Sequence, residues 1–176
     1  MDTELITLAG GCFWCLEAVF LRVRGVVSVE SGYCNGHMPS PTYEAVCSGA
    51  TGHAEVVRVR FDPAQVSLRQ ILEVFLHIHD PTSLNRQGAD EGTQYRSGIY
   101  FHTEAQRELA AEVLREANEA LGGRVVTELA AEANYTPAEG YHQRYFERNP
   151  GQGYCAYVVA PKVRKFEASF KALIAS

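Results

Sequence analysis

The sequence predicts an α+β fold, a two-layer sandwich in which helices pack on a mixed, mainly antiparallel sheet. Alternating or apolar segments typical of strands are interspersed with amphipathic helical segments in the order β, α, β, β, α, β, α, β. The 176 residues are about the length of one domain, and no internal repeat or low-complexity linker divides them. We therefore expect residues 1–176 to form a single domain.

The N-terminal third contains a strand, a helix and a second strand. Residues 4–9, "ELITLA", are apolar enough for a short buried strand, and the two glycines that follow can turn the backbone. Residues 12–23 then place large apolar side chains at helical spacing, and residues 25–33 alternate as a strand. Cys12 therefore lies where a strand gives way to a helix.

The middle of the chain predicts a third strand and a second helix. In residues 55–61, "EVVRVRF", Val57, Val59 and Phe61 fall on one face and the two arginines on the other. Residues 67–80 follow a helical apolar pattern that begins at the capping residue Ser67. The preceding residues 34–53 are rich in Gly, Pro, Ser and Thr, which is typical of a long loop.

The remaining elements follow a second polar loop over residues 81–96. Residues 97–102 predict a strand, residues 103–123 a helix that ends at two glycines, and residues 124–130 a final strand. The last forty or so residues are aromatic and of mixed pattern.

Composition and charge exclude several classes of protein. The net charge of -5, with no run of lysine or arginine, argues against nucleic-acid binding. No stretch of about 18 apolar residues and no signal-peptide pattern occurs, so we expect no membrane association and a cytoplasmic location. Five cysteines without framework spacing argue against a secreted disulfide scaffold.

The stretch "GGCFWC", residues 10–15, allows three interpretations. A structural zinc site needs four Cys or His ligands, but the chain has only one C-x2-C pair, so we expect no metal. A dithiol redox motif stays open, because C-x2-C at a helix start suits one. The third interpretation is one reactive thiol, since a helix N-terminus should lower the pKa of Cys12 below about 8.5.

Four separated segments decide between these interpretations. In chain order they are "GGCFWC", "PTYEAVCSGATGHAEVV", "DPTSLNRQGADEGTQYRS" and "YHQRYFERNPGQGYC". Together they resemble the A-type peptide methionine sulfoxide reductases over nearly the whole chain. The resemblance implies an α+β catalytic domain that reduces the S epimer of methionine sulfoxide, free or in oxidised proteins. It also implies thioredoxin as the electron donor and no metal or organic cofactor.

The resemblance also assigns roles to individual residues. It implies that Cys12 is the nucleophile and that Phe13 and Trp14 form the apolar pocket for the substrate's methyl group. The remaining implied roles are hydroxyl donors to the sulfoxide oxygen (Tyr43 and Tyr95), the acid (Glu55), an acidic residue that orders the site (Asp90) and the recycling cysteine (Cys155). Glu55 can hold its proton near pH 7 only if burial raises its pKa, which a wall formed by Phe13 and Trp14 would do.

Position 15 departs from the family pattern, because Cys15 stands where glycine is common. A cysteine one helical turn from Cys12 leaves three routes for the resolving step: Cys155, Cys15, or a relay through both. We favour Cys155, because the proline and glycines of "NPGQGYC" predict a flexible C-terminal segment that brings it to Cys12. Cys34 and Cys47 are interpreted as incidental thiols, and the protein is expected to be a monomer.

Overall fold

A single mixed sheet forms the centre of the computed structural model, which describes residues 2–175. Its strands lie in the order β7–β6–β1–β3–β2–β8. Their bounds are β1 (Glu4–Ala9), β2 (Val26–Cys34), β3 (Ala54–Phe61), β6 (Gly98–Phe101), β7 (Glu128–Ala131) and β8 (Thr136–Pro137). Only β6 and β7 pair in parallel, and every other neighbouring pair is antiparallel. The predicted α+β fold with a mainly antiparallel sheet is confirmed.

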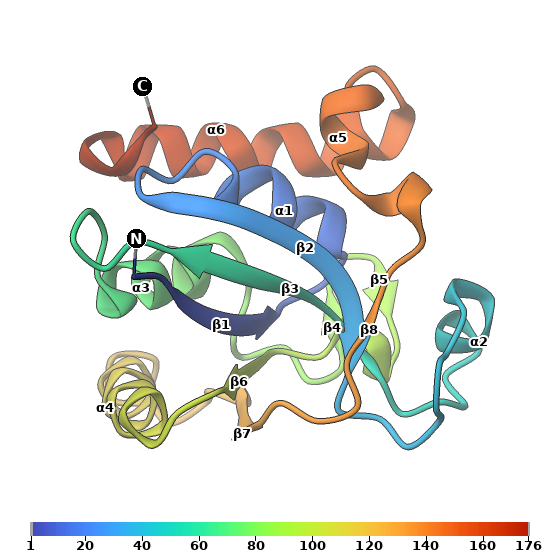
Figure 1. Cartoon of the computed structure of the whole chain (residues 1–176), viewed down its shortest axis with the longest axis horizontal. Helices are drawn as coiled ribbons and strands as arrows, with labels where there is room; N and C mark the ends of the chain where they lie inside the picture. Colours follow the sequence, from blue (N-terminus) through green and yellow to red (C-terminus); the bar gives the residue numbers. More distant parts are fainter. Residues whose placement is uncertain (1, 176) are drawn as a thin grey trace.

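The helices are α1 (Phe13–Phe20), α2 (Tyr43–Cys47), α3 (Leu68–Ile78), α4 (Glu104–Ala120), α5 (Tyr145–Arg148) and α6 (Ala160–Ser169). In Figure 1, α1 and α6 lie above the strands, and α4 lies beside β6 and β7 at the opposite end. The predicted start of α3 is correct: Ser67 and Gln70 form a reciprocal capping box there.

Short elements occupy the two regions predicted as loops. Residues 34–53 contain α2, and residues 81–96 contain the hairpin of β4 (Arg86–Gln87) and β5 (Asp90–Glu91) and the 3-10 turn η1 (Thr93–Tyr95). The later short elements are the 3-10 turns η2 (Gly140–His142) and η4 (Lys171–Leu173) and the π-helix η3 (Cys155–Val159). These connections carry four of the side chains that the sequence singles out for chemistry: Tyr43, Asp90, Tyr95 and Cys155.

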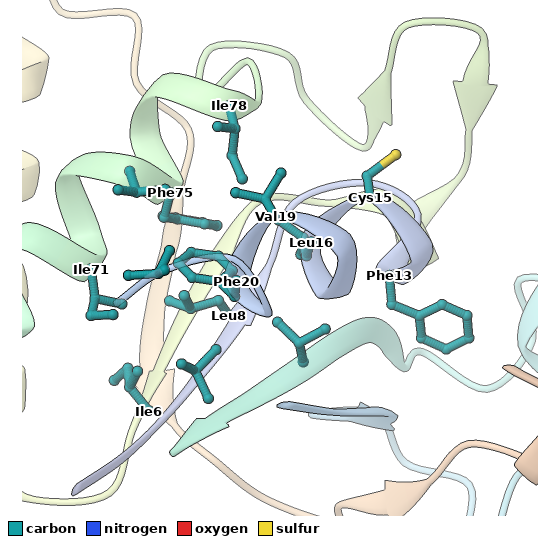
Figure 2. Close-up of a cluster of buried hydrophobic side chains, with 14 of the residues drawn as sticks. Ile6, Leu8, Phe13, Cys15, Leu16, Val19, Phe20, Ile71, Phe75 and Ile78 are labelled. Carbon is teal, nitrogen blue, oxygen red and sulfur yellow. The ribbon is translucent and has the colours of Figure 1, made fainter. Parts of the chain in front are cut away.

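The main hydrophobic core lies between the sheet and α1, α3 and α6. Figure 2 shows Ile6 and Leu8 of β1 beneath α1, with Phe20 directed toward Phe75 of α3. All four of these side chains are fully buried. Because burying such a side chain contributes about 1.5–3 kcal/mol, this packing fixes α1 on β1 and so fixes the turn between them.

A polar network helps to cover the opposite face of the sheet. Arg58 of β3 donates two hydrogen bonds to the Glu132 carboxylate, at 2.8 and 2.6 Å. The Arg58 guanidinium also lies 3.6 Å from the centre of the Tyr135 ring. The segment after β7 is thereby held on this face, where Cys34 is fully buried in a small apolar cluster.

Candidate active site

Cys12 lies at the turn between β1 and α1, as predicted. Gly11 has a φ of 89°, in the left-handed region that favours glycine, and a Cβ there would approach the Gln87 side chain to 3.0 Å. Cys12 is the residue immediately before α1, and its carbonyl accepts the Cys15 amide at 3.1 Å. Its side chain caps no helix amide and is half-buried, and all five cysteines are free thiols.

Glu55 reaches the same helix end from the neighbouring strand β3. Its side chain is buried, and its Oε1 accepts the backbone N–H of Phe13 at 3.1 Å. Burial raises the pKa of Glu55 to about 8, with a further increase from the negative charge of Asp90, while the Phe13 hydrogen bond lowers it. Glu55 therefore keeps its proton at neutral pH, beside Cys12, and can donate it to a bound molecule.

The predicted pKa of Cys12 is wrong in direction. Burial raises the pKa of the Cys12 thiol well above its ordinary value, and negative charge at Glu55 and Cys15 raises it further. Only the backbone N–H of Trp14 lowers it, so the helix N-terminus is outweighed by desolvation and like-charge repulsion. In the unliganded protein Cys12 is a thiol, and its ionisation is coupled to the protonation of Glu55.

An aromatic cluster surrounds the beginning of α1. Phe13 is fully buried, whereas Trp14 is partly exposed and stacks on the Tyr145 ring, with 3.8 Å between ring centres. Trp14 Nε1–H donates to Nδ1 of the buried His142 at 3.1 Å. The centre of the His142 ring also lies 5.1 Å from the centre of the Phe13 ring and 4.5 Å from that of the Tyr43 ring. An apolar group could pack here against Phe13 and Trp14.

Tyr43 and Tyr95 come from two different loops. Tyr43 begins α2, and its backbone N–H donates to Glu139 at 2.9 Å, while the other Glu139 oxygen accepts the Tyr33 hydroxyl at 2.9 Å. Tyr95 ends η1. Burial is the main cause that raises the pKa of both tyrosines, and the charge of Glu55 contributes to both. Their hydroxyl groups are therefore protonated donors close to Glu55.

Asp90 lies in β5 and is linked to the C-terminal region. Its Oδ2 accepts the Tyr154 hydroxyl at 2.6 Å. The Tyr154 ring meets Trp14 edge-on, with 5.7 Å between ring centres. Asp90 therefore holds one wall of the aromatic cluster, and its charge helps Glu55 to keep its proton.

Cys155 and Cys15 are both buried behind this cluster. Cys155 is the first residue of η3, and its N–H donates to the Gln152 side chain at 3.1 Å. Within the segment predicted to be flexible, residues 150–152 form a turn and a bend and only residues 153–155 are helical; its mobility stays a prediction. Figure 2 shows Cys15 pointing away from Ile6 and Leu8, and burial raises the pKa of its thiol to about 11. Of the other cysteines, Cys47 is exposed at the end of α2.

Sequence reasoning missed several residues of this site. His142, Tyr145, Tyr154 and Tyr33 contact side chains that were singled out, and Glu139 accepts the backbone N–H of Tyr43. The available signal was the aromatic segment "YHQRYFERNPGQGYC", from which only Cys155 was used. Dense Tyr and His in a segment of irregular pattern, downstream of a candidate nucleophile, is the feature that could have found most of them.

Over residues 2–175 there is no group of three or more His, Cys, Asp or Glu side chains that could hold a metal ion. No helix in that range combines the length and the hydropathy that a membrane span requires.

Comparison with known proteins places the chain in a family. The family model described as "Peptide methionine sulfoxide reductase" matches residues 4–173. The peptide methionine sulfoxide reductase MsrA of Polynucleobacter asymbioticus is 56% identical over 174 residues, which cover 98% of this chain and 92% of that protein.

Two solved structures of Mxr1 from Saccharomyces cerevisiae are also similar. The reduced form has a TM-score of 0.83 and 38% identity, and the match covers 88% of this chain and 90% of that one. Mxr1 in complex with Trx2 has a TM-score of 0.59 and 27% identity, with coverage of 82% and 85%. By sequence and by fold, the chain belongs to the A-type peptide methionine sulfoxide reductases, which are oxidoreductases.

Proposed function

We propose that this enzyme reduces the S epimer of methionine sulfoxide, free or in oxidised proteins, by attack of Cys12 on the sulfoxide sulfur. The observation that carries the proposal is the buried, protonated Glu55 carboxyl at the first amide of α1, next to Cys12. The substrate's methyl group packs against Phe13 and Trp14. Its oxygen then accepts hydrogen bonds from Glu55, Tyr43 and Tyr95.

The raised pKa of Cys12 is compatible with this chemistry, because substrate changes the charge balance of the site. Transfer of the Glu55 proton to the sulfoxide oxygen gives the sulfur a positive charge, which attracts and stabilises a thiolate. As the thiolate forms, Cys12 loses its proton to solvent, and its sulfur bonds to the substrate sulfur. The sulfur–oxygen bond of the substrate then breaks, and the hydroxyl group is left on the Cys12 sulfur. The products are the methionine thioether and the Cys12 sulfenic acid, so one oxygen atom has moved and the sulfoxide has been reduced by two electrons.

Recycling consumes a second thiol. We propose that Cys155 condenses with the sulfenic acid to give a disulfide and one water molecule, and that the dithiol of thioredoxin then reduces this disulfide. A structure of yeast Mxr1 in complex with Trx2 supports a thioredoxin partner. Since Cys155 is fully buried in η3, the π-helix must open first. In this proposal the enzyme works in the cytoplasm as a monomer and uses no metal or organic cofactor.

The first test is stereochemical. Purified enzyme with dithiothreitol is given the separate S and R epimers of methionine sulfoxide, and methionine is quantified by chromatography. We expect turnover of the S epimer only, and none by Cys12→Ser. Cys34→Ser is the matched control, because Cys34 lies on the opposite face of the sheet. Equal turnover of both epimers, or activity in Cys12→Ser, would refute the proposal.

The second test concerns the resolving thiol. We expect Cys155→Ser to form one methionine per enzyme molecule without reductant but to lose cycling with thioredoxin. Cys15→Ser should keep cycling, and mass mapping after one equivalent of substrate should find the Cys12–Cys155 disulfide. A Cys12–Cys15 peptide in that map, with full cycling in Cys155→Ser, would transfer the role to Cys15.

A further inference from the structure

A cavity of about 680 Å³ lies next to the aromatic cluster, on the far side of Tyr154. It is lined by the end of α3, the β4–β5 hairpin, the residues after α4, and η3 with α6. Asp90 and Tyr154 belong both to this cavity and to the site around Trp14. A volume of this size is in the range of ligand-binding pockets.

Three cations line the cavity: Arg124, Lys162 and Lys165. Within residues 2–175, none of the three has a carboxylate oxygen within 4.0 Å. Two of these charges act on neighbouring histidines. Burial is the main cause that lowers the pKa of His79 and His77, and the charge of Lys162 lowers that of His79 further, as the charge of Lys165 does for His77. These cations stand out on a protein whose net charge is -5.

The two carboxylates that line the same cavity are already engaged. Asp80 Oδ1 accepts the Thr82 amide at 2.9 Å and the Thr82 hydroxyl at 2.6 Å. Asp90 accepts the Tyr154 hydroxyl. The cavity therefore has three cationic side chains without a salt-bridge partner and two carboxylates that accept from neutral donors, and this excess of positive charge favours an anionic ligand.

We propose that this cavity is a subsite for acidic side chains that flank methionine sulfoxide in a peptide or protein substrate. This inference rests on the proposed function and names its preferred protein substrates. Tyr154 lines the cavity and also meets the Trp14 ring edge-on, so the cavity adjoins the proposed site. An extended peptide advances about 3.3–3.6 Å per residue, so a side chain two positions from the sulfoxide reaches past a single ring. Carboxylates there would meet Lys162 and Lys165 of α6.

The test compares capped pentapeptides with S-methionine sulfoxide at the centre and Asp, Asn or Lys at both ends. Placing the variable residue at both ends makes the result independent of the direction of binding. We expect kcat/KM to be roughly tenfold higher for the Asp peptide than for the Lys peptide at low salt. The preference should shrink toward unity in about 1 M salt, where screening acts within a few ångströms.

Two variants locate the effect. Lys162→Gln combined with Lys165→Gln should reduce the Asp-to-Lys preference to about twofold or less, because the facing charges are gone. Arg164→Gln removes the same charge from an exposed position of α6 that does not line the cavity, and it should keep the full preference. The ratio between peptides cancels any effect on the chemistry, and kcat/KM does not depend on the recycling thiols.

The outcomes separate the two claims. Equal kcat/KM for the Asp and Lys peptides in the wild-type enzyme, or a preference unchanged in the double variant, would overturn the subsite. If even the neutral Asn peptide is not reduced, the proposed function itself fails.

Discussion

Glu55 shows how a single side chain can be set for acid chemistry by its surroundings. It lies on β3, where most side chains are buried, and it faces the first amide of a helix. Burial and the charge of Asp90 raise its pKa to about 8. The same environment disfavours a second negative charge on Cys12, so the pair carries at most one charge near neutral pH.

We predict that the pH dependence of sulfoxide reduction follows the titration of Glu55. The active form has Glu55 protonated, so the single-turnover rate should fall as the pH rises above about 8. Glu55→Gln should lower the rate by about 100-fold or more and remove this falling limb, since an amide donates a hydrogen bond but no proton. Rapid-quench measurements from pH 6 to 10 give both quantities. Glu44→Gln, an exposed position of α2, should keep the wild-type profile; a falling limb that persists in Glu55→Gln would assign it to another group.

The sequence indicated which residues lie at this site, but it did not indicate their protonation states. The motifs indicated Cys12, Glu55 and Asp90, and the structure brings them together. The direction of the shift in the Cys12 pKa could not be predicted, because it depends first on burial of the thiol and then on the charge of Glu55, which β3 places against α1. His142 was missed because its partner Trp14 lies 128 positions away in the sequence.

At the scale of elements, packing of α1 against α5 brings the C-terminal region to the site. Arg22 pairs with Glu147 at 2.6 Å, and Trp14 stacks on Tyr145. Between these contacts lies Glu17, which is buried and whose carboxyl oxygens have no hydrogen-bond partner among the described residues. Burial raises the pKa of Glu17 to about 7, with a contribution from the charge of Glu147.

Glu17 predicts a pH-dependent stability. Its folded pKa of about 7 exceeds the ordinary value of 4.5, so the folded state binds more protons than the unfolded state between these limits. The contribution of Glu17 to the free energy of unfolding is therefore fully present below pH 4.5 and is lost as the pH rises through about 7. Glu17→Gln should stabilise the protein by on the order of 1–3 kcal/mol at pH 8.5 and much less at pH 5.

Urea unfolding of both proteins at the two pH values measures this difference. Glu167→Gln, an exposed position of α6, is the control and should change stability little at either pH. An equal effect of Glu17→Gln at both pH values would show that the carboxyl does not titrate in this range.

Element boundaries were predictable where hydrophobic patterns repeat and less so elsewhere. The strands at residues 4–9 and 55–61 are almost unchanged in the structure. The strand expected at residues 124–130 begins only at Glu128, because the amides of Val125 and Val126 donate to Asn118 and Pro81 instead. The proline and first glycine before Cys155 lie in a turn and a bend over residues 150–152, and a helix begins only at residue 153, with Cys155, Val159 and Phe166 buried in it.

At the scale of the whole molecule, the two faces of the sheet are covered by different means. Helices and apolar side chains cover one face, whereas the segment after β7 is tied to the other by Arg58 and Glu132. Glu132 is also reached by the Thr7 hydroxyl at 2.7 Å. Sequence patterns predicted the helical face, but they could not predict a salt bridge between residues 74 positions apart.

We predict that this partly buried pair matters more than an exposed one. Glu132→Ala leaves Arg58 partly buried without its partner and should lower the free energy of unfolding by about 2–4 kcal/mol. Glu116→Ala breaks the exposed pair with Arg69 and should cost less than about 1 kcal/mol. Denaturant midpoints provide the comparison, and equal losses in the two variants would contradict the structural role given to Glu132.

The hydrogen bond from the Phe13 amide to Glu55 has a consequence for the end of each reaction. In the proposed reaction Glu55 becomes an anion once it has given its proton away, and this anion faces the amide end of α1, where a negative charge is stabilised. The Glu55 carboxylate can then keep its position while methionine dissociates and a proton from solvent restores the acid. The helix that positions the Cys12 sulfur, α1, therefore also stabilises the negative charge that the proposed proton transfer places on Glu55.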